Sequence, residues 1–128
     1  MDRRRLLRNS ASIAFAGVAL IACRTAPIQG EVPGEFIGRG GLSQRSEQIR
    51  RAGAGLGWVM ESRGPGLMRG TLNLRGHQAL VDIPYDSQRF TIRYAGSSNL
   101  NYDGQSIHPN YNSWVQNLQR AIMSQPPA

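Results

Sequence analysis

The chain has 128 residues, a formal net charge of +7 and a single cysteine. This length allows one small domain, with or without a targeting segment, and it excludes a multidomain enzyme. One cysteine excludes an intramolecular disulfide framework and a cysteine-based zinc site, while 40% hydrophobic residues are enough for a modest core.

The first 22 residues have the layout of an export signal. Four arginines within residues 1–8 precede the uncharged run 9–22, which is a basic head followed by a short apolar segment. A helix as long as this run spans about 21 Å, less than the ~30 Å hydrocarbon core, so a permanent membrane-spanning helix is disfavoured. The basic head suits general secretion, and its paired arginines also suit the twin-arginine route.

The apolar run ends in Leu20-Ile21-Ala22-Cys23, which resembles the lipobox of bacterial lipoproteins. The resemblance implies cleavage after Ala22, diacylglycerol on the Cys23 sulfur, acylation of the new amino group and no further cofactor. Arg24 after the cysteine, where Asp would signal retention, resembles outer-membrane sorting. We therefore expect a lipid anchor in the outer membrane, with the protein on its periplasmic face.

Residues 23–41 have the composition of a flexible lipidated tether, because prolines and glycines interrupt them and no hydrophobic period is sustained. The folded domain is then expected over residues 42–124, with 125–128 as a tail. Cleavage after residue 22 would leave 11 arginines and 7 acids, a net charge of +4.

The predicted elements of the domain are a helix, four strands and a second helix. The first helix covers residues 43–56, where apolar residues lie at i, i+3, i+4 and i+7. Alternating residues predict strands near 58–63, 68–75, 77–85 and 89–94, and their short connections indicate antiparallel neighbours. The second helix starts at Pro109 and has one apolar face, made by Tyr111, Trp114, Val115, Leu118 and Ile122.

These elements predict an α+β fold with two layers: a four-stranded antiparallel meander with both helices on one sheet face. Both helices must bury an apolar stripe, and one sheet face can serve both. The other sheet face is then open to solvent.

Strand alternation places a set of arginines on this open face: Arg63, Arg69, Arg75, Arg89 and Arg93. Glu61 and Asp82 oppose them, so this face would carry +3 of the remaining +4. Arginine binds carboxylates and phosphates through two parallel hydrogen bonds. The set predicts a partner-binding face for an acidic envelope protein, a lipid head group or an anionic envelope polymer. The alternative is a solvated face whose charges pair across strands.

An enzymatic alternative rests on His77, His108 and the loop Ser97–Asp103. A small periplasmic hydrolase or a metal-dependent enzyme would use such residues. However, the chain has no Gly-x-Ser-x-Gly motif and no His-x-x-His spacing, so no catalytic or metal-ligating residue is assigned. We expect a non-enzymatic protein. Nucleic acid is excluded as a partner because the chain is exported and the open face lacks interleaved stacking aromatics.

Two further segments resemble small uncharacterised lipoproteins of Gram-negative bacteria: one is 75–85, and the other is 98–102 followed by 107–114 and Leu118. The resemblance extends over residues 47–122 and carries no catalytic role. It implies an envelope lipoprotein.

Overall fold

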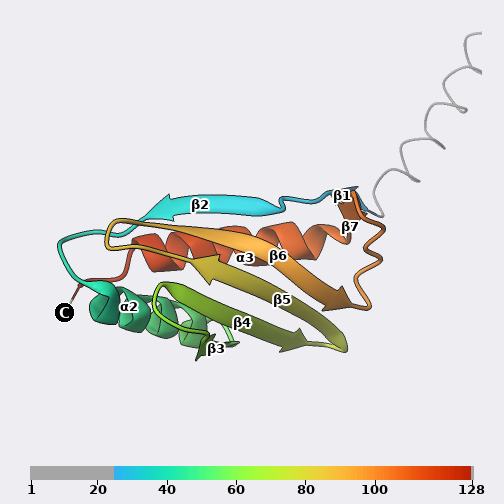
Figure 1. Cartoon of the computed structure of the whole chain (residues 1–128). Helices are drawn as coiled ribbons and strands as arrows, with labels where there is room; N and C mark the ends of the chain where they lie inside the picture. The colour runs from blue at the N-terminus through green and yellow to red at the C-terminus, as the bar shows by residue number, and fades with distance from the viewer. Residues whose placement is uncertain (1–24, 128) are drawn as a thin grey trace, which may run out of the picture.

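The computed structural model describes residues 25–127, so the predicted signal and Cys23 lie outside the described residues. The fold is α+β, with helices that contact an antiparallel sheet (Figure 1). Its elements are β1 (Ala26–Pro27), β2 (Glu31–Glu35), α2 (Leu42–Gly55), β3 (Trp58–Ser62), β4 (Leu67–Leu74), β5 (His77–Pro84), β6 (Arg89–Ser98), β7 (Ser106–Ile107) and α3 (Pro109–Met123).

The main sheet has five antiparallel strands in the order β2-β6-β5-β4-β3, and β1 pairs with β7 in a second sheet of two strands. The meander of β3 to β6 matches the prediction, but the strand count of four was wrong. Strand β2 pairs along the free edge of β6, with Glu31 opposite Arg93 and Glu35 opposite Arg89. Residues 26–27 and 31–35 are therefore strands of the fold, and the prediction of a flexible tether was wrong for them.

Strand β2 was not predicted from local composition, because Pro33 and Gly34 are typical of a linker. As an edge strand, β2 tolerates Pro33, because an outward-facing position needs no N–H for the ladder. Gly34 lies against the ring of its cross-strand partner Phe90, and a Cβ at Gly34 would collide with Phe90 Cζ. The aromatic ring thus covers the gap that the glycine leaves.

Helix α3 holds the same segment through a stripe of amide side chains at i, i+4 and i+7, a spacing that puts them on one helix face. The amides donate three hydrogen bonds: Asn112 Nδ2 to Pro27 O (2.9 Å), Gln116 Nε2 to Gln29 Oε1 (2.8 Å) and Gln119 Nε2 to Pro33 O (2.6 Å). The stripe and the β6 ladder together keep residues 26–35 in place.

The two helices and one face of the sheet share a single core. Helix α3 buries Tyr111, Val115, Leu118 and Ile122, as its spacing predicts. Helix α2 packs against β3 and α3, and α3 packs against β2. Leu56 is the C-cap of α2 and Leu74 is the last residue of β4, and at these ends both side chains are 41% exposed.

Helix α2 approaches β3 closely at Gly53. A Cβ at this position would lie 2.6 Å from Met60 Cε and 3.3 Å from Trp58 Cβ, so the flexible Met60 side chain would have to move to admit a larger residue. The glycine that lowers the intrinsic stability of this helix therefore allows its close approach to β3.

Helix α2 also buries Arg45, which is 1% exposed. Its guanidinium donates to the carbonyl oxygens of Ile37, Gly38 and Ser87 and to Gln48 Oε1, at 2.7–3.0 Å, and it lies over the Phe36 ring. These bonds join the start of α2 to the β5–β6 turn. Gln48 and Arg51 bind the backbone of Gln125 and Pro126, so residues 125–127 are docked on α2.

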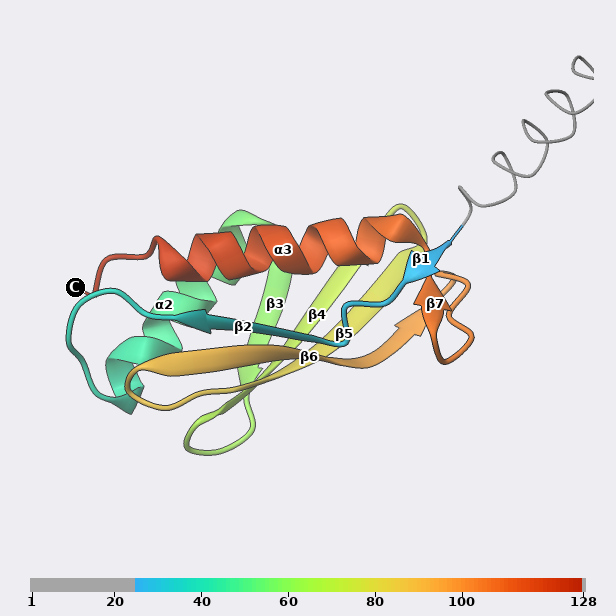
Figure 2. The same cartoon turned by 90° about the horizontal axis from the view of Figure 1, so that it is seen from above.

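The domain is elongated and has two distinct ends (Figure 2). One, called here the β1–β7 end, comprises residues 25–27, 74–77 and 99–108, and it includes the start of α3. The other, called here the C-terminal end, comprises residues 36–41, 86–88 and 124–127. Strand β6 runs from the C-terminal end to the β1–β7 end.

Candidate partner-binding face

The outer face of the sheet carries a row of charges that alternate in sign across all five strands. From β3 to β2 the register places side by side Glu61, Arg69, Asp82, Arg93 and Glu31. Opposite charges on neighbouring strands stabilise the pairing, and like charges there would weaken it. The row therefore fits the alternative interpretation of the arginine face, in which its charges pair across strands in a solvated surface.

The ion pairs of this face differ in strength. Arg69 Nε donates to Asp82 Oδ1 at 2.6 Å, and the two side chains are only 26% and 36% exposed. This hydrogen bond, with the charge of Asp82, raises the pKa of the Arg69 guanidinium. Arg93 lies 3.6 Å from Glu31, and both side chains are more than half exposed. Pairs as exposed as the second contribute about 0–1 kcal/mol.

The other three predicted arginines lie nearer the edges of the face. Arg89 Nε is 3.8 Å from Glu35 Oε1, with both side chains over 70% exposed. Arg63 follows β3, and Arg75 occupies the β4–β5 turn with a φ of 53°. Within residues 25–127, neither Arg63 nor Arg75 lies in an ion pair.

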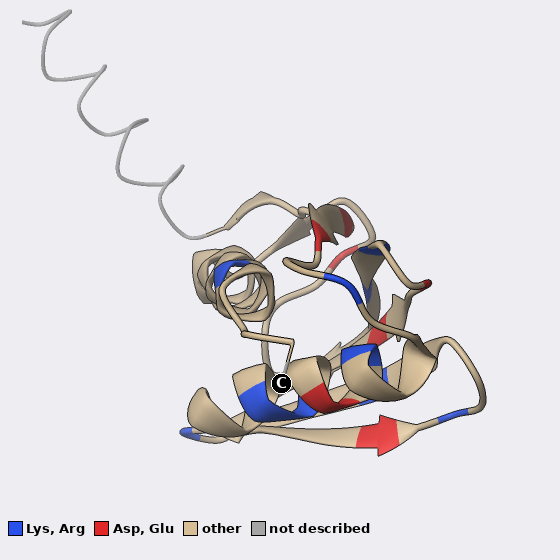
Figure 3. Cartoon of the chain, turned by 90° about the vertical axis from the view of Figure 1, so that its left-hand side faces the viewer, with Lys and Arg blue, Asp and Glu red and all other residues tan. Residues whose placement is uncertain are grey.

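The predicted excess of positive charge on this face was too high. Glu31 and Glu35 had been assigned to the tether, but β2 brings them onto the face opposite Arg93 and Arg89. Five arginines then meet four acids, a net charge of +1 where +3 was expected. Figure 3 shows basic and acidic positions interspersed along the ribbon.

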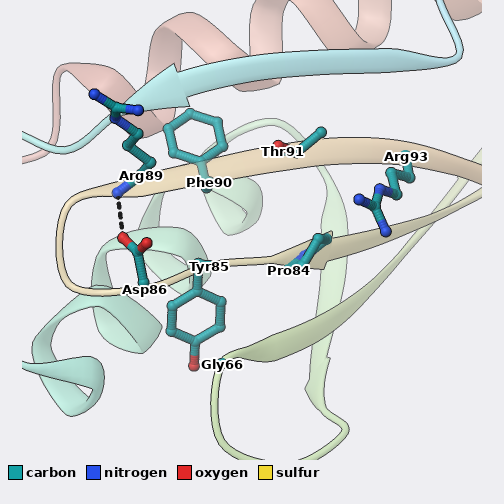
Figure 4. A pocket seen from close by; sticks show the side chains of 8 residues that line it. All are labelled: Gly66, Pro84, Tyr85, Asp86, Arg89, Phe90, Thr91 and Arg93. Atoms are coloured by element: carbon teal, nitrogen blue, oxygen red, sulfur yellow. Dashed lines mark hydrogen bonds between the residues drawn. The ribbon is translucent and has the colours of Figure 1, made fainter.

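A hollow of about 300 Å³ opens on this face beside the start of β6. Arg89, Thr91 and Arg93 line it from β6, and Pro84 and Tyr85 line it from the end of β5 (Figure 4). The guanidinium groups of Arg89 and Arg93 flank Thr91, so two cations and a hydroxyl border one hollow.

Asp86 also lines the hollow, but its carboxylate is already engaged in backbone hydrogen bonds. Its Oδ1 accepts the backbone N–H groups of Gln88 and Arg89, at 2.8 and 2.7 Å. These bonds lower the pKa of the Asp86 carboxyl. The carboxylate is thus committed to the β5–β6 turn that presents Arg89.

The predicted enzymatic set comes together only in part. The His77 and His108 rings lie 5.9 Å apart, and His77 also lies 6.4 Å from the Trp114 ring. His77 Nδ1 is 2.6 Å from Asn99 O, so Nδ1 carries the proton and Nε2 is free to accept. His108 Nδ1 accepts the N–H of Asn110 as the N-cap of α3, so its proton is on Nε2. With opposite tautomers, the two imidazoles do not form a pair of metal ligands in this state.

The residues of the Ser97–Asp103 loop are used in local structure. Ser97 Oγ hydrogen-bonds to Tyr94 Oη at 2.7 Å. Asp103 Oδ1 accepts the N–H groups of Gln105 and Ser106, which lowers the pKa of its carboxyl. In the described part of the chain, neither Ser97 nor Ser98 hydrogen-bonds to an imidazole. The same part holds no group of three His, Cys, Asp or Glu residues placed to bind a metal ion.

Sequence reasoning missed two features of this region. One is β2, because its composition is typical of a linker. The other is Tyr111, whose hydroxyl is buried with no hydrogen-bond partner among residues 25–127. Burial raises the pKa of this phenol.

In the described residues, no helix is long and apolar enough to cross a bilayer.

Comparison with family models, curated proteins and solved structures found no match to this chain.

Proposed function

We propose that the chain is a lipid-anchored lipoprotein of the outer membrane whose two-layer α+β domain binds an envelope partner and performs no catalysis. The anchor is Cys23, after the lipobox-like residues 20–22, and the bound lipid is its only added group. An acidic envelope protein is the partner best suited to the face. A lipid head group or an anionic envelope polymer would present the same carboxylate or phosphate chemistry.

The observation that carries the docking proposal is the hollow bordered by Arg89 and Arg93. Both guanidiniums have exposed carboxylate neighbours at 3.6–3.8 Å, and such pairs are weak. A partner that supplies a carboxylate or phosphate can replace Glu35 or Glu31 at small cost and can bind each guanidinium in a bidentate way. Thr91 offers a hydroxyl between them.

The five arginines would have different roles in docking. Arg69 is tied to Asp82 and orients the charge row. Arg89 and Arg93 would contact the partner. Arg63 and Arg75 lie at opposite ends of the outer face and would add only long-range attraction.

Docking is favoured over hydrolysis by the roles of the histidines. His108 caps α3 and His77 fixes the turn at Asn99, and neither borders the hollows found in the described domain. A general base needs a free nitrogen that faces a bound substrate, and His77 lines none of these hollows.

A photocrosslinking amino acid at Thr91 in the full-length protein, expressed in its own cells, tests the docking proposal. We expect a discrete protein adduct from Thr91 and none from a control position at Glu47 on α2. The double variant Arg89→Gln/Arg93→Gln should abolish the adduct. The matched variant Arg50→Gln/Arg120→Gln removes the same charge from the helices and should keep it.

Persistence of the adduct in Arg89→Gln/Arg93→Gln, or equal adducts from Thr91 and Glu47, would overturn docking at this face. An adduct that resists protease would assign the partner to the polymer class. Thermal unfolding checks that the double variants remain folded, as exposed pairs of this kind predict.

A further inference from the structure

We propose that the β1–β7 end of the domain lies directly on the phospholipid surface, with the C-terminal end pointing away from it. This orientation rests on the lipid anchor proposed above. The structural reason for this orientation is that residues 26–35, which were expected to be part of a flexible tether, belong to the fold.

The connection from the anchor to the fold is very short. Only Arg24 and Thr25 separate Cys23 from Ala26, and three residue steps span at most about 11 Å. Ala26 is fixed opposite Ile107, and Ile28 N donates to Gln105 O at 3.0 Å. Lipid on Cys23 would therefore hold this end of the domain within about one head-group layer of the bilayer.

The chemistry of the β1–β7 end suits a membrane interface. Tyr102 is 42% exposed, and its ring lies against that of Tyr94, with a distance of 4.4 Å between ring centroids and a tilt of 39°. Leu74 is 41% exposed at the tip of the β4–β5 hairpin, and the exposed Arg75 follows it. Tyrosine, an aliphatic side chain and a cation are the groups that interfaces with anionic lipid attract.

The acidic group at this end is Asp103, and its carboxylate would be only weakly repelled by anionic lipid. Its carboxylate accepts two backbone N–H groups within its own turn. At the β1–β7 end as described, no other Asp or Glu is present.

The orientation also places the docking hollow. Arg89 starts β6 at the C-terminal end, and Ser98 ends it at the β1–β7 end. Nine steps of ~3.3 Å put Arg89 about 30 Å from the end that would face lipid. The Arg89 side of the hollow would then lie away from the membrane, where a partner can reach it.

The single cysteine allows a direct test. Lipid blocks Cys23, so a second cysteine in the full-length lipidated protein can be labelled uniquely with an environment-sensitive fluorophore. We choose Gln105→Cys at the β1–β7 end and Ser87→Cys at the C-terminal end, both exposed. The proteins are reconstituted in phosphatidylethanolamine and phosphatidylglycerol vesicles that contain nitroxide-labelled lipid.

The proposal expects most of the fluorescence to be quenched at position 105 and little at position 87. Insertion of about twelve Gly and Ser residues between Thr25 and Ala26 should remove much of the quenching at 105, since a flexible linker frees the domain. Tyr102→Ser should reduce it too.

Flotation with the vesicles separates the two proposals. A lipidated protein that floats but is quenched equally at 105 and 87 overturns the orientation and leaves the anchor standing. A protein that fails to float overturns the anchor, and the orientation with it. Cys23→Ser should neither float nor show quenching at either position.

Discussion

Gln119 Nε2 donates a 2.6 Å hydrogen bond to the carbonyl oxygen of Pro33, and so joins α3 to β2. On its other side β2 is paired with β6. A segment that has the composition of a linker is thus held from two sides. Four predictions follow from the contacts that hold the fold in this form.

The bonded N–H groups within residues 28–36 should show slow amide exchange, because β2 pairs with β6 and Gln29 N–H donates to Asn112 Oδ1. The double variant Asn112→Ala/Gln119→Ala should raise exchange in this segment and lower the free energy of unfolding by about 1–2 kcal/mol. Hydrogen–deuterium exchange with mass spectrometry measures the first effect. Ser113→Ala, on the same helix with its side chain exposed, is the control. Random-coil exchange of 28–36 in the unaltered protein would contradict the fold.

Arg45→Met should lower the free energy of unfolding by about 2–4 kcal/mol. The methionine fills a similar volume but leaves three carbonyl oxygens and Gln48 Oε1 without their donor. Arg39→Met, an exposed change in the neighbouring loop, should stay within about 0.5 kcal/mol. Urea unfolding measures both values. Equal stabilities would show that the Arg45 bonds contribute nothing net.

Asp86 and Asp103 should make stability depend on pH in acid. Backbone N–H groups hold both carboxyl pKa values below the ordinary 3.8. A folded-state pKa below the unfolded one stabilises the fold above about pH 4, and this contribution is lost as pH falls through the lowered values. The double variant Asp86→Asn/Asp103→Asn keeps the acceptor oxygens without the titration. Its unfolding free energy should therefore fall less steeply between about pH 5 and pH 2, and a slope unchanged from the wild type would refute the assignment.

Arg75→Asn should stabilise the domain by about 0.5–1 kcal/mol. Arg75 and Gly76 form a two-residue hairpin turn in which both φ values are positive, 53° and 80°. Asparagine adopts this conformation at less cost than arginine. Thermal unfolding compares the two, with Arg75→Ala expected to give no gain. If Asn and Ala behave alike, backbone strain at position 75 is not the reason.

Much of the fold was predictable because periodicity determines it. Helix α3 and strands β3 to β5 begin and end within one or two residues of their predicted bounds, since their apolar residues repeat at the period of the element. Strand β6 runs four residues further than predicted, because a bulge opposite Leu80 and Val81 shifts its alternation after Tyr94. Strands β1 and β2 could not be predicted locally, because Pro33 and Gly34 are accommodated only through Phe90 and Gln119.

The candidate site was predictable in part for the same reason. Alternation correctly placed Arg69, Arg89 and Arg93 on the open face, because their strands were identified. It overstated the charge of that face, because Glu31 and Glu35 reach it only when β2 forms. Their pairing depends on contacts more than fifty residues apart, which a local pattern does not contain.

The most direct test of the account is the mass of the amino-terminal peptide of the protein isolated from membranes. A lipid-anchored protein should begin at Cys23 and carry diacylglycerol on sulfur and a fatty acyl chain on nitrogen, and labelled palmitate should enter the unaltered protein but not Cys23→Ser. An uncleaved chain, or an unmodified Cys23, would contradict the anchor and the envelope function built on it.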